Sequence, residues 1–322
     1  MERLLNLLSG EIEIAEDPFG VFSSLRKQIT PSKLRFIPSN SSEVFMLDSD
    51  EGRFALKFGT RVLNKPYDKL EKEFWACREL SLNPRLSVSE PIAYVRGKDT
   101  ELEILNWINK ASTASQSILD DGQIFDMWDQ ILEIQETLRR SSSNQIRSVL
   151  NKHEGDIPYA QKLIKYIKRH MGIEISPDVF LGLDSYLNSP RLKSQKTIIT
   201  DRNPTNWLIT RNQTIIPIDF DMLLSEPVMS DFALYIDDHR LQTKYDRDQL
   251  VQMLLSFFAN KEIPVEPADF HYCAIYRNLL HCAILFSKSK KSVPIALQKS
   301  LQSAEAIGDQ LLVEAITALQ RS

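Results

Sequence analysis

One stretch of the sequence, residues 198–231, constrains the fold of this chain more than any other. An apolar run leads into a loop that extends from Asp201 to Asn206. A predicted β-hairpin follows, with a polar turn at residues 210–213, and it ends at Asp219. Side chains at the ends of short strands are held rigidly, and Asp and Asn oxygens suit hard cations such as Mg²⁺.

The spacing of these three side chains is that of kinases. A kinase catalytic loop carries Asp-x-x-x-x-Asn, in which the Asp orients the attacking hydroxyl, and a second Asp after the next strand holds Mg²⁺. Asp201 and Asn206 have this spacing, and Asp219 follows the next apolar strand. With a proline inside the loop and acidic segments at residues 218–221 and 226–231, the stretch resembles the aminoglycoside phosphotransferase and choline kinase superfamily. The alternative is an ordinary hairpin, because Asp and Asn are common turn residues.

The whole chain has the composition of an ordinary soluble globular protein of one or two domains, with 322 residues, 43% hydrophobic residues and a net charge of −4. The acidic balance argues against a general nucleic-acid binder, which is usually basic. No apolar run reaches about 18 residues, and the three cysteines form no CxxC pair. Residues 1–8 are too short for a signal peptide, so we expect a cytoplasmic protein with no membrane segment.

The N-terminal third has the pattern of strands with short polar connections. Apolar runs bounded by a polar loop and a turn predict three strands, at residues 34–37, 43–47 and 53–58. Residues 90–95 and 101–108 predict a further hairpin that ends in an apolar turn. These segments predict a β-rich N-terminal lobe.

Lys57, in the third of these strands, matches the lysine that grips the nucleotide phosphates in a kinase small lobe. The loop before the second strand corresponds to the loop that covers the phosphates, although it contains no glycine. Its backbone and hydroxyl groups offer hydrogen-bond donors instead, from Ser39, Asn40, Ser41 and Ser42. The alternative for Lys57 is a solubilising lysine at a strand edge.

A helix predicted at residues 67–80 carries the partner of this lysine. Glu73 falls on the apolar face of the helix, whereas Glu71 lies off that face and is predicted to be solvated. A buried carboxylate without a partner is costly, so Glu73 needs a cation, and Lys57 is the obvious one. The two residues correspond to the lysine–glutamate pair of kinases.

From residue 109 onward the pattern becomes mainly helical. Apolar residues at helical spacing predict helices at residues 124–140, 159–170, 177–187, 232–241, 247–258, 270–286 and 293–319. The second of these helices has a basic side made of Lys162, Lys165, Lys168 and Arg169. Such a side is either simply solvated or a contact for an anionic substrate or partner.

The resemblance extends over most of the chain and implies an α+β, two-lobed protein-kinase-like fold. Residues 1–108 would form the nucleotide-binding lobe, and residues 109–322 a helical lobe with the catalytic loop and the substrate site. The implied activity is that of a phosphotransferase that depends on ATP and Mg²⁺ and transfers the γ-phosphate to a hydroxyl group of a small molecule.

The same resemblance implies a role for each candidate site residue. Asp201 orients or deprotonates the acceptor hydroxyl, and Asn206 and Asp219 hold Mg²⁺. Lys57 binds the nucleotide phosphates, and Glu73 positions Lys57. The backbone of the hinge between the lobes reads adenine, and this hinge comprises Leu105, Asn106, Trp107 and Ile108. Trp107 is equally compatible with a place in the core.

Two further acidic residues receive supporting roles. Asp231 either caps its helix or tethers the catalytic loop, since an acidic residue is favoured at a helix N-terminus. Asp221 assists the metal or the substrate.

The sequence departs from the superfamily pattern at two places, the glycine-free loop and the pair before the catalytic Asp. The superfamily usually has His-Gly in that pair, and here it is Ile199–Thr200. Two alternatives therefore stay open, a kinase that acts on a protein or RNA and a nucleotide-binding pseudokinase. The sequence also leaves open the acceptor, the choice between ATP and GTP, and the oligomeric state.

Overall fold

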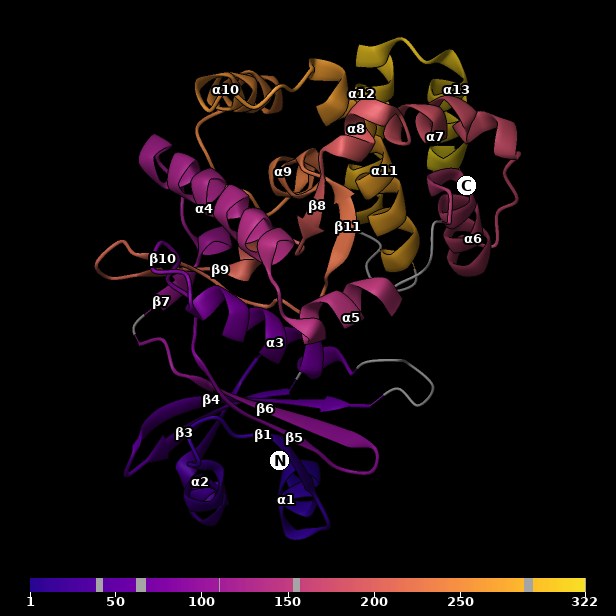
Figure 1. Ribbon diagram of the computed structural model, residues 1–322. Coiled ribbons are helices and arrows are strands. Elements are labelled where there is room, and N and C mark those ends of the chain that lie inside the picture. The colour runs from indigo at the N-terminus through magenta and orange to yellow at the C-terminus, as the bar shows by residue number, and fades with distance from the viewer. Residues whose placement is uncertain (39–42, 62–67, 110, 153–156, 287–291, 322) are drawn as a thin grey trace. The chain divides into compact units, whose positions relative to one another are not determined.

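The computed structural model describes residues 1–38, 43–61, 68–109, 111–152, 157–286 and 292–321 (Figure 1). The chain divides into two compact units that interleave along the sequence. The first unit contains residues 1–112, 136–153 and 208–223, and the second contains residues 113–135, 154–207 and 224–322. The mixture of an antiparallel sheet with many helices confirms the predicted α+β class.

A six-stranded antiparallel sheet forms the centre of the first unit, in the order β1-β5-β6-β4-β3-β2. Its strands are β1 (Glu13–Glu16), β2 (Leu34–Ile37), β3 (Glu43–Ser49), β4 (Gly52–Thr60), β5 (Pro91–Arg96) and β6 (Thr100–Asn106). The five strands expected from the sequence are all present. Strand β1 was not predicted, because its four residues include two glutamates and all four are exposed or half-buried, so they give no alternating signal.

The two faces of this sheet differ in character. Helices α1 (Glu2–Ser9) and α2 (Phe22–Gln28) cover one face, with a large apolar core that includes Leu56 and Ile104. Helix α3 (Lys69–Ser81) covers the other face, where the apolar cluster is small. Because side chains alternate along a strand, neighbours of the core residues point toward α3, and these include polar residues. The face of the sheet that α3 covers (Figure 1) therefore carries polar side chains as well as apolar ones.

The start of α3 is fixed by a capping box between Asp68 and Glu71. Glu71 also pairs with Arg96 of β5 and is buried, so the prediction of a solvated Glu71 is wrong. Helical periodicity places Glu71 off the apolar face, but it does not reveal that a strand arginine reaches that side of the helix.

The remaining elements of the first unit are a helix and a small sheet. Helix α5 (Asn144–Lys152) was not predicted. Strands β7 (Ala111–Thr113), β9 (Trp207–Thr210) and β10 (Ile215–Pro217) form a sheet in the order β10-β9-β7, with the end residues Thr113 and Trp207 assigned to the second unit. The β9–β10 pair is the hairpin expected from the sequence, and it leads directly to Asp219.

The second unit is mainly helical, as predicted. Helix α4 (Asp121–Arg140) begins in it, and the other helices are α6 (Tyr159–Met171), α7 (Leu181–Leu187), α8 (Pro190–Ser194), α9 (Met229–Asp237), α10 (Arg247–Asn260), α11 (Pro267–Leu285), α12 (Ser292–Ile307) and α13 (Gln310–Arg321). Helix α11 is the centre, packed against α6, α9 and α12. Strands β8 (Lys196–Ile199) and β11 (Leu224–Pro227) pair antiparallel.

Several of the predicted helices have different bounds; the one expected at residues 232–241, for example, is α9 at Met229–Asp237, and two others also differ in kind. The helix expected at residues 293–319 is two helices, because Gly308 between them has a left-handed φ of 70° and Asp309 caps the next helix at the Leu312 N–H. The helix expected at residues 177–187 begins as a 3₁₀ turn before α7.

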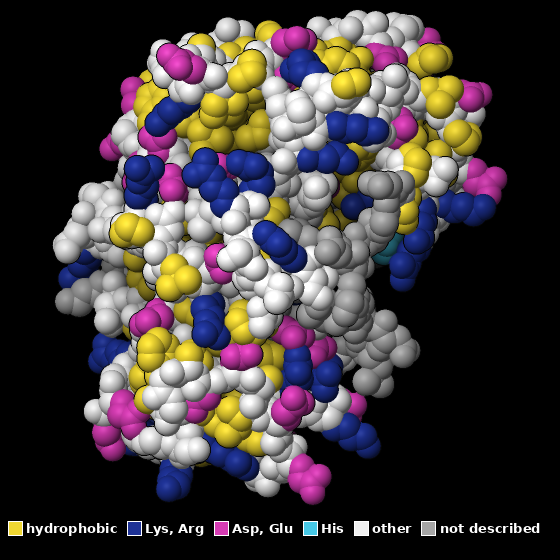
Figure 2. Space-filling view, in the orientation of Figure 1, with side chains coloured by type: hydrophobic (Ala, Val, Ile, Leu, Met, Phe, Trp, Pro, Cys, Tyr) yellow, Lys and Arg dark blue, Asp and Glu magenta, His cyan; other side chains and the backbone are white. Residues whose placement is uncertain are grey.

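The described helices include none that is long and apolar enough to cross a membrane. On the face of the molecule in Figure 2, acidic and basic side chains both lie among apolar and uncharged ones.

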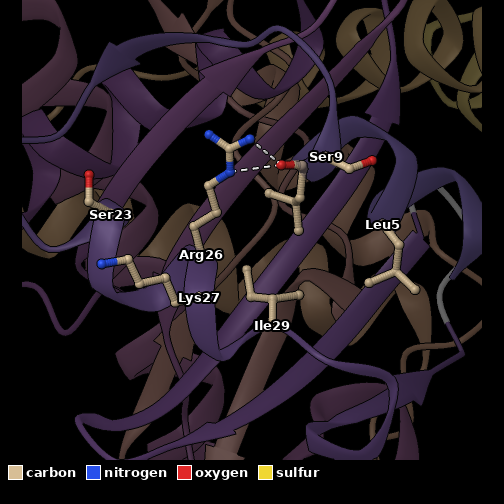
Figure 3. A pocket seen from close by; sticks show the side chains of 7 residues that line it. Leu5, Ser9, Ser23, Arg26, Lys27 and Ile29 are labelled. Carbon is tan, nitrogen blue, oxygen red and sulfur yellow. Dashed lines mark hydrogen bonds between the residues drawn. The ribbon is translucent and has the colours of Figure 1, made fainter.

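Arg26 of α2 fastens the end of α1 (Figure 3). Its Nε donates to the carbonyl oxygen of Leu8 at 2.7 Å, and its Nη2 reaches the carbonyl oxygen of Gly10 at 3.4 Å. A cation is favoured at a helix C-terminus, where carbonyl groups lack helical partners. Arg26 also lines the groove between α1 and α2, so its guanidinium is engaged in a structural contact there.

Candidate active site

The predicted pair of Lys57 and Glu73 is present in the first unit. Lys57 lies on β4 and Glu73 on α3, and the distance from Lys57 Nζ to Glu73 Oε1 is 2.5 Å. The side chains are 12% and 1% exposed, so this is a buried ion pair. Burial lowers the pKa of Lys57, but attraction to Glu73 and Asp219 outweighs it and raises the pKa above its usual value. Lys57 is therefore a fixed positive charge, and the strand-edge alternative is wrong.

Asp219 joins this pair from the hairpin. Its Oδ1 lies 3.3 Å from Lys57 Nζ, so the three residues predicted to act together in this unit are in contact. Asp219 has a left-handed backbone with a φ of 63°, which is uncommon outside glycine and tends to occur at functional sites. Two residues later, Asp221 forms an ion pair with Lys69 of α3.

Glu103 of β6 is a member of this cluster that the sequence analysis missed. It lies directly across the β4–β6 ladder from Lys57 and is completely buried. Both carboxyl oxygens of Glu103 lack a hydrogen-bond partner among the described residues. Burial, together with repulsion from Glu73, raises the pKa of Glu103 well above its usual value, although attraction to Lys57 opposes this.

A signal for Glu103 exists in the sequence, because Glu101 and Glu103 alternate along an otherwise apolar strand and so share one face. Glu101 accepts hydrogen bonds from the Leu70 N–H and the Tyr94 hydroxyl, each at 3.1 Å. Burial raises the pKa of Glu101 to about 7. The α3 face of β6 therefore carries two carboxyl groups behind Lys57.

The predicted hinge, residues 105–108, comprises the last two residues of β6 and the two that follow. The Asn106 N–H donates to the Glu90 carbonyl and the Trp107 N–H donates to the Arg53 carbonyl, both at 3.0 Å. These two donors are therefore engaged within the fold. Trp107 is half-buried. The predicted phosphate loop, Ser39, Asn40, Ser41 and Ser42, lies outside the described residues.

In the second unit, Asp231 anchors the catalytic loop. Its carboxylate accepts from the backbone N–H groups of Thr200 at 3.1 Å and Arg202 at 3.3 Å, and from Gln135 Nε2 at 3.2 Å. Asp231 is completely buried, and burial raises its pKa despite the attraction of Arg202. Of the two predicted roles, tethering of the loop is confirmed.

The loop itself presents Asp201 and Asn206. Asp201 has a left-handed φ of 57°, and the Asn206 side-chain amide donates to the Asp201 carbonyl at 2.7 Å. This bond uses the nitrogen of the amide and leaves its oxygen as the atom that can ligate a cation. Arg202, which the sequence analysis did not single out, is fully buried and donates to the Thr200 carbonyl at 2.7 and 3.1 Å.

The departure at Ile199–Thr200 leaves this scaffold intact. Both residues are completely buried at the end of β8. The Thr200 backbone, rather than its side chain, is what Asp231 holds, and the Thr200 hydroxyl has no hydrogen-bond partner among the described residues. Isoleucine and threonine therefore stand where the superfamily usually has histidine and glycine, and the hydrogen bond from the Thr200 N–H to Asp231 is still present.

The charged groups near Asp201 are largely paired with one another. Arg277 donates to Glu226 at 3.2 Å, and Arg240 donates to Asp238 at 2.6 Å. Attraction to Asp201 contributes to the raised pKa of both arginines. The carboxylates of Glu226 and Asp238 are therefore already paired with arginines.

The predicted site residues thus form two groups. Lys57, Glu73 and Asp219 are in contact in the first unit, and Asp201 and Asn206 share one loop in the second. Asp and Asn oxygens are the ligands that Mg²⁺ accepts, and a buried lysine is the kind of charge that phosphates require. The residues present therefore fit Mg²⁺ and a nucleoside triphosphate.

No protein-family model matches the sequence, and no curated protein matches it. Solved structures do match in fold. An amicoumacin kinase, in complex with AMP-PNP and Ca²⁺, has a TM-score of 0.62 at 13% identity, covering 89% of this chain and 94% of that one. The chain has the fold of the aminoglycoside phosphotransferase and choline kinase superfamily.

Two further structures of this superfamily fold are similar to the chain. A microcompartment-associated aminopropanol kinase has a TM-score of 0.61 at 14% identity, covering 87% of this chain and 93% of that one. A choline kinase from Streptococcus pneumoniae has a TM-score of 0.59 at 14% identity, covering 89% of this chain and 98% of that one. The predicted two-lobed kinase-like fold is confirmed, and the low identities agree with a divergent sequence.

Proposed function

We propose that the protein is an ATP- and Mg²⁺-dependent phosphotransferase that acts on a hydroxyl group of a small molecule. The observation that carries this proposal is the buried contact of Lys57 with both Glu73 and Asp219 in the first unit. Burying three charged groups is costly unless they are paired, and a structural role needs no such arrangement. The similar solved structures, which are small-molecule kinases by name, support the same activity.

In this proposal each side chain has a distinct task. Lys57 neutralises the nucleotide phosphates and is held in place by Glu73. Asp219 and the amide oxygen of Asn206 would hold Mg²⁺, and the ion would supply positive charge to the nucleotide phosphates. Asp201, in the loop that Asp231 anchors, accepts a hydrogen bond from the acceptor hydroxyl and directs its oxygen at the phosphate.

An ion pair on the basic side of α6 favours a small acceptor over a macromolecule. Lys168, one of its four basic residues, is paired with Glu174 at 2.6 Å, so its charge is already matched. The net charge of −4 also argues against a general nucleic-acid binder, which is usually basic.

The loss of the Asp219 carboxylate tests the proposal directly. Asp219→Ala should weaken Mg²⁺-dependent ATP binding by about tenfold or more, because it removes a metal ligand, and it should leave the protein folded. Binding is measured by titrating ATP with and without Mg²⁺, and folding by circular dichroism. Asp50→Ala, which removes a carboxylate that is 84% exposed, is the matched control. Equal Mg·ATP binding by wild type and Asp219→Ala would contradict the proposal.

A further inference from the structure

A second ion pair ties the Asp219 segment to α3. Lys69, the first residue of α3, contacts Oδ2 of Asp221 through its ammonium group. Asp221 lies two residues after Asp219, and Lys69 lies four residues before Glu73. Residues four apart are neighbours on a helix surface, so Lys69 and Glu73 lie side by side on α3. Two residues on one face of α3 therefore contact residues 219–221. Glu73 does so through Lys57, and Lys69 does so directly.

The segment that these contacts hold is conformationally demanding. Asp219 has a left-handed φ of 63°, and such a backbone persists only where its surroundings hold it. The Asp221 side chain is 15% exposed and the Lys69 side chain 41% exposed, so the carboxylate of this pair is mostly withdrawn from water. A partly buried pair is screened less by salt than a surface pair.

The two contacts differ in their relation to the proposed nucleotide site. Lys57, proposed to bind the phosphates, and Asp219, proposed to hold Mg²⁺, form one contact at 3.3 Å. The pair of Lys69 and Asp221 contains neither residue. We propose that Lys69 is a positioning residue, which acts through Asp221 to keep the Asp219 carboxylate in place for the metal. This inference rests on the proposed function.

Four variants and one control test it. Lys69→Met keeps the length of the side chain and removes its charge, Lys69→Arg keeps the charge, and Asp221→Asn removes the partner charge. The fourth variant combines Lys69→Met with Asp221→Asn. Lys98→Met, at an exposed lysine in the β5–β6 turn, is the control. For each protein, ATP binding is titrated across Mg²⁺ concentrations and in EDTA, and thermal unfolding is recorded without nucleotide.

We expect Lys69→Met and Asp221→Asn each to lower the apparent Mg²⁺ affinity about tenfold, as removal of a residue that orients a metal ligand does. The double variant should lose no more than either single one, and Lys69→Arg should recover most of the affinity. ATP binding in EDTA and the melting temperature should change little. A purely structural role would instead lower the melting temperature and would leave the Mg²⁺ dependence unchanged.

An unchanged Mg²⁺ dependence in Lys69→Met overturns the inference, and so does additive loss in the double variant. A loss in Lys98→Met equal to that in Lys69→Met overturns it as well, because any surface charge would then have the same effect. If wild type itself shows no Mg²⁺-dependent ATP binding, both the proposed function and this inference fall. That outcome is distinct from a wild type that binds Mg·ATP and a Lys69→Met variant that binds it equally well.

Discussion

Glu73 and Glu103 are chemically identical and both are buried beside Lys57, yet their hydrogen bonding differs. Glu73 receives the lysine ammonium at 2.5 Å. Glu103, across the ladder from the same lysine, has no hydrogen-bond partner among the described residues, and its pKa is raised well above the usual value, mainly by burial. A second carboxylate at this place would compete for Lys57, whereas a neutral carboxyl group leaves the ion pair with Glu73 undisturbed.

Glu103→Gln should therefore stabilise the protein at neutral pH. The unfolded state releases the Glu103 proton above a pH of about 4.5, but the folded state retains it, so wild-type stability falls as the pH rises, by up to about 1.4 kcal/mol per pH unit. Glutamine cannot ionise and removes this dependence. Urea unfolding at pH 5 and pH 7 measures the effect, with Glu11→Gln at an exposed position as the control. A variant less stable than wild type at pH 7 would show that Glu103 is ionised and paired with Lys57.

The sequence was sufficient to predict the pair of Lys57 and Glu73, because a carboxylate on an apolar helix face demands a cation. It was not sufficient for Glu71, whose partner Arg96 comes from a strand that helical periodicity cannot place. Glu103 was missed for a related reason, since alternation shows which face a strand residue occupies but not what covers that face. The network of Asp231 was anticipated, but the burial of Arg202 beneath the loop was not.

Helix α9 and the catalytic loop behave as one element. Asp231, in the first turn of α9, accepts hydrogen bonds from the N–H groups of Thr200 and Arg202. The helix therefore holds the backbone on both sides of Asp201. Strand and helix positions were mostly predictable because hydrophobic periodicity reports burial. The break at Gly308 and the short elements β1, α5 and α8 were not, because a few residues give too little periodicity.

Asp231→Ala should be strongly destabilising. It leaves two buried N–H groups without an acceptor and removes a buried negative charge that attracts Arg202, which should cost about 3–5 kcal/mol. Asp248→Ala, at an exposed acid in the first turn of α10, controls for the helix dipole and should cost less than about 1 kcal/mol. Denaturant unfolding of both variants measures the difference. Equal effects would mean that Asp231 acts only as a charge at a helix end.

The molecule as a whole combines the fold of these kinases with an unusual pair of residues, Ile199–Thr200, before Asp201, the aspartate proposed to act in catalysis. The fold is established by solved structures, but at 13–14% identity these do not transfer an activity. The pseudokinase alternative therefore has to be decided by chemistry. A kinase and a pseudokinase differ in the side chains that are needed for phosphate transfer but not for nucleotide binding. In the proposed mechanism, Asp201 is such a side chain.

Asp201→Asn should bind Mg·ATP as wild type does and lose phosphate transfer. The substitution keeps the shape of the side chain but removes the charge that accepts the hydroxyl proton, and such groups contribute about 10²- to 10⁴-fold to the rate. Transfer is measured from labelled ATP to a mixture of sugars, amino alcohols and hydroxylated antibiotics, alongside slow ATP hydrolysis. Equal turnover by the two proteins, with ATP bound by both, would identify a pseudokinase.

The interleaving of the two units has a consequence for how the chain is made. The first unit takes its last segment from residues 208–223, so Asp219 meets Lys57 only after 162 further residues have been synthesised. Contacts so distant in sequence form slowly, because the long loop between them must first be closed. A fragment that ends at residue 112 would contain the whole six-stranded sheet and its lysine but not the hairpin that supplies Asp219. During translation, Lys57, Glu73 and Glu103 therefore lack their contact with Asp219 until the hairpin has left the ribosome.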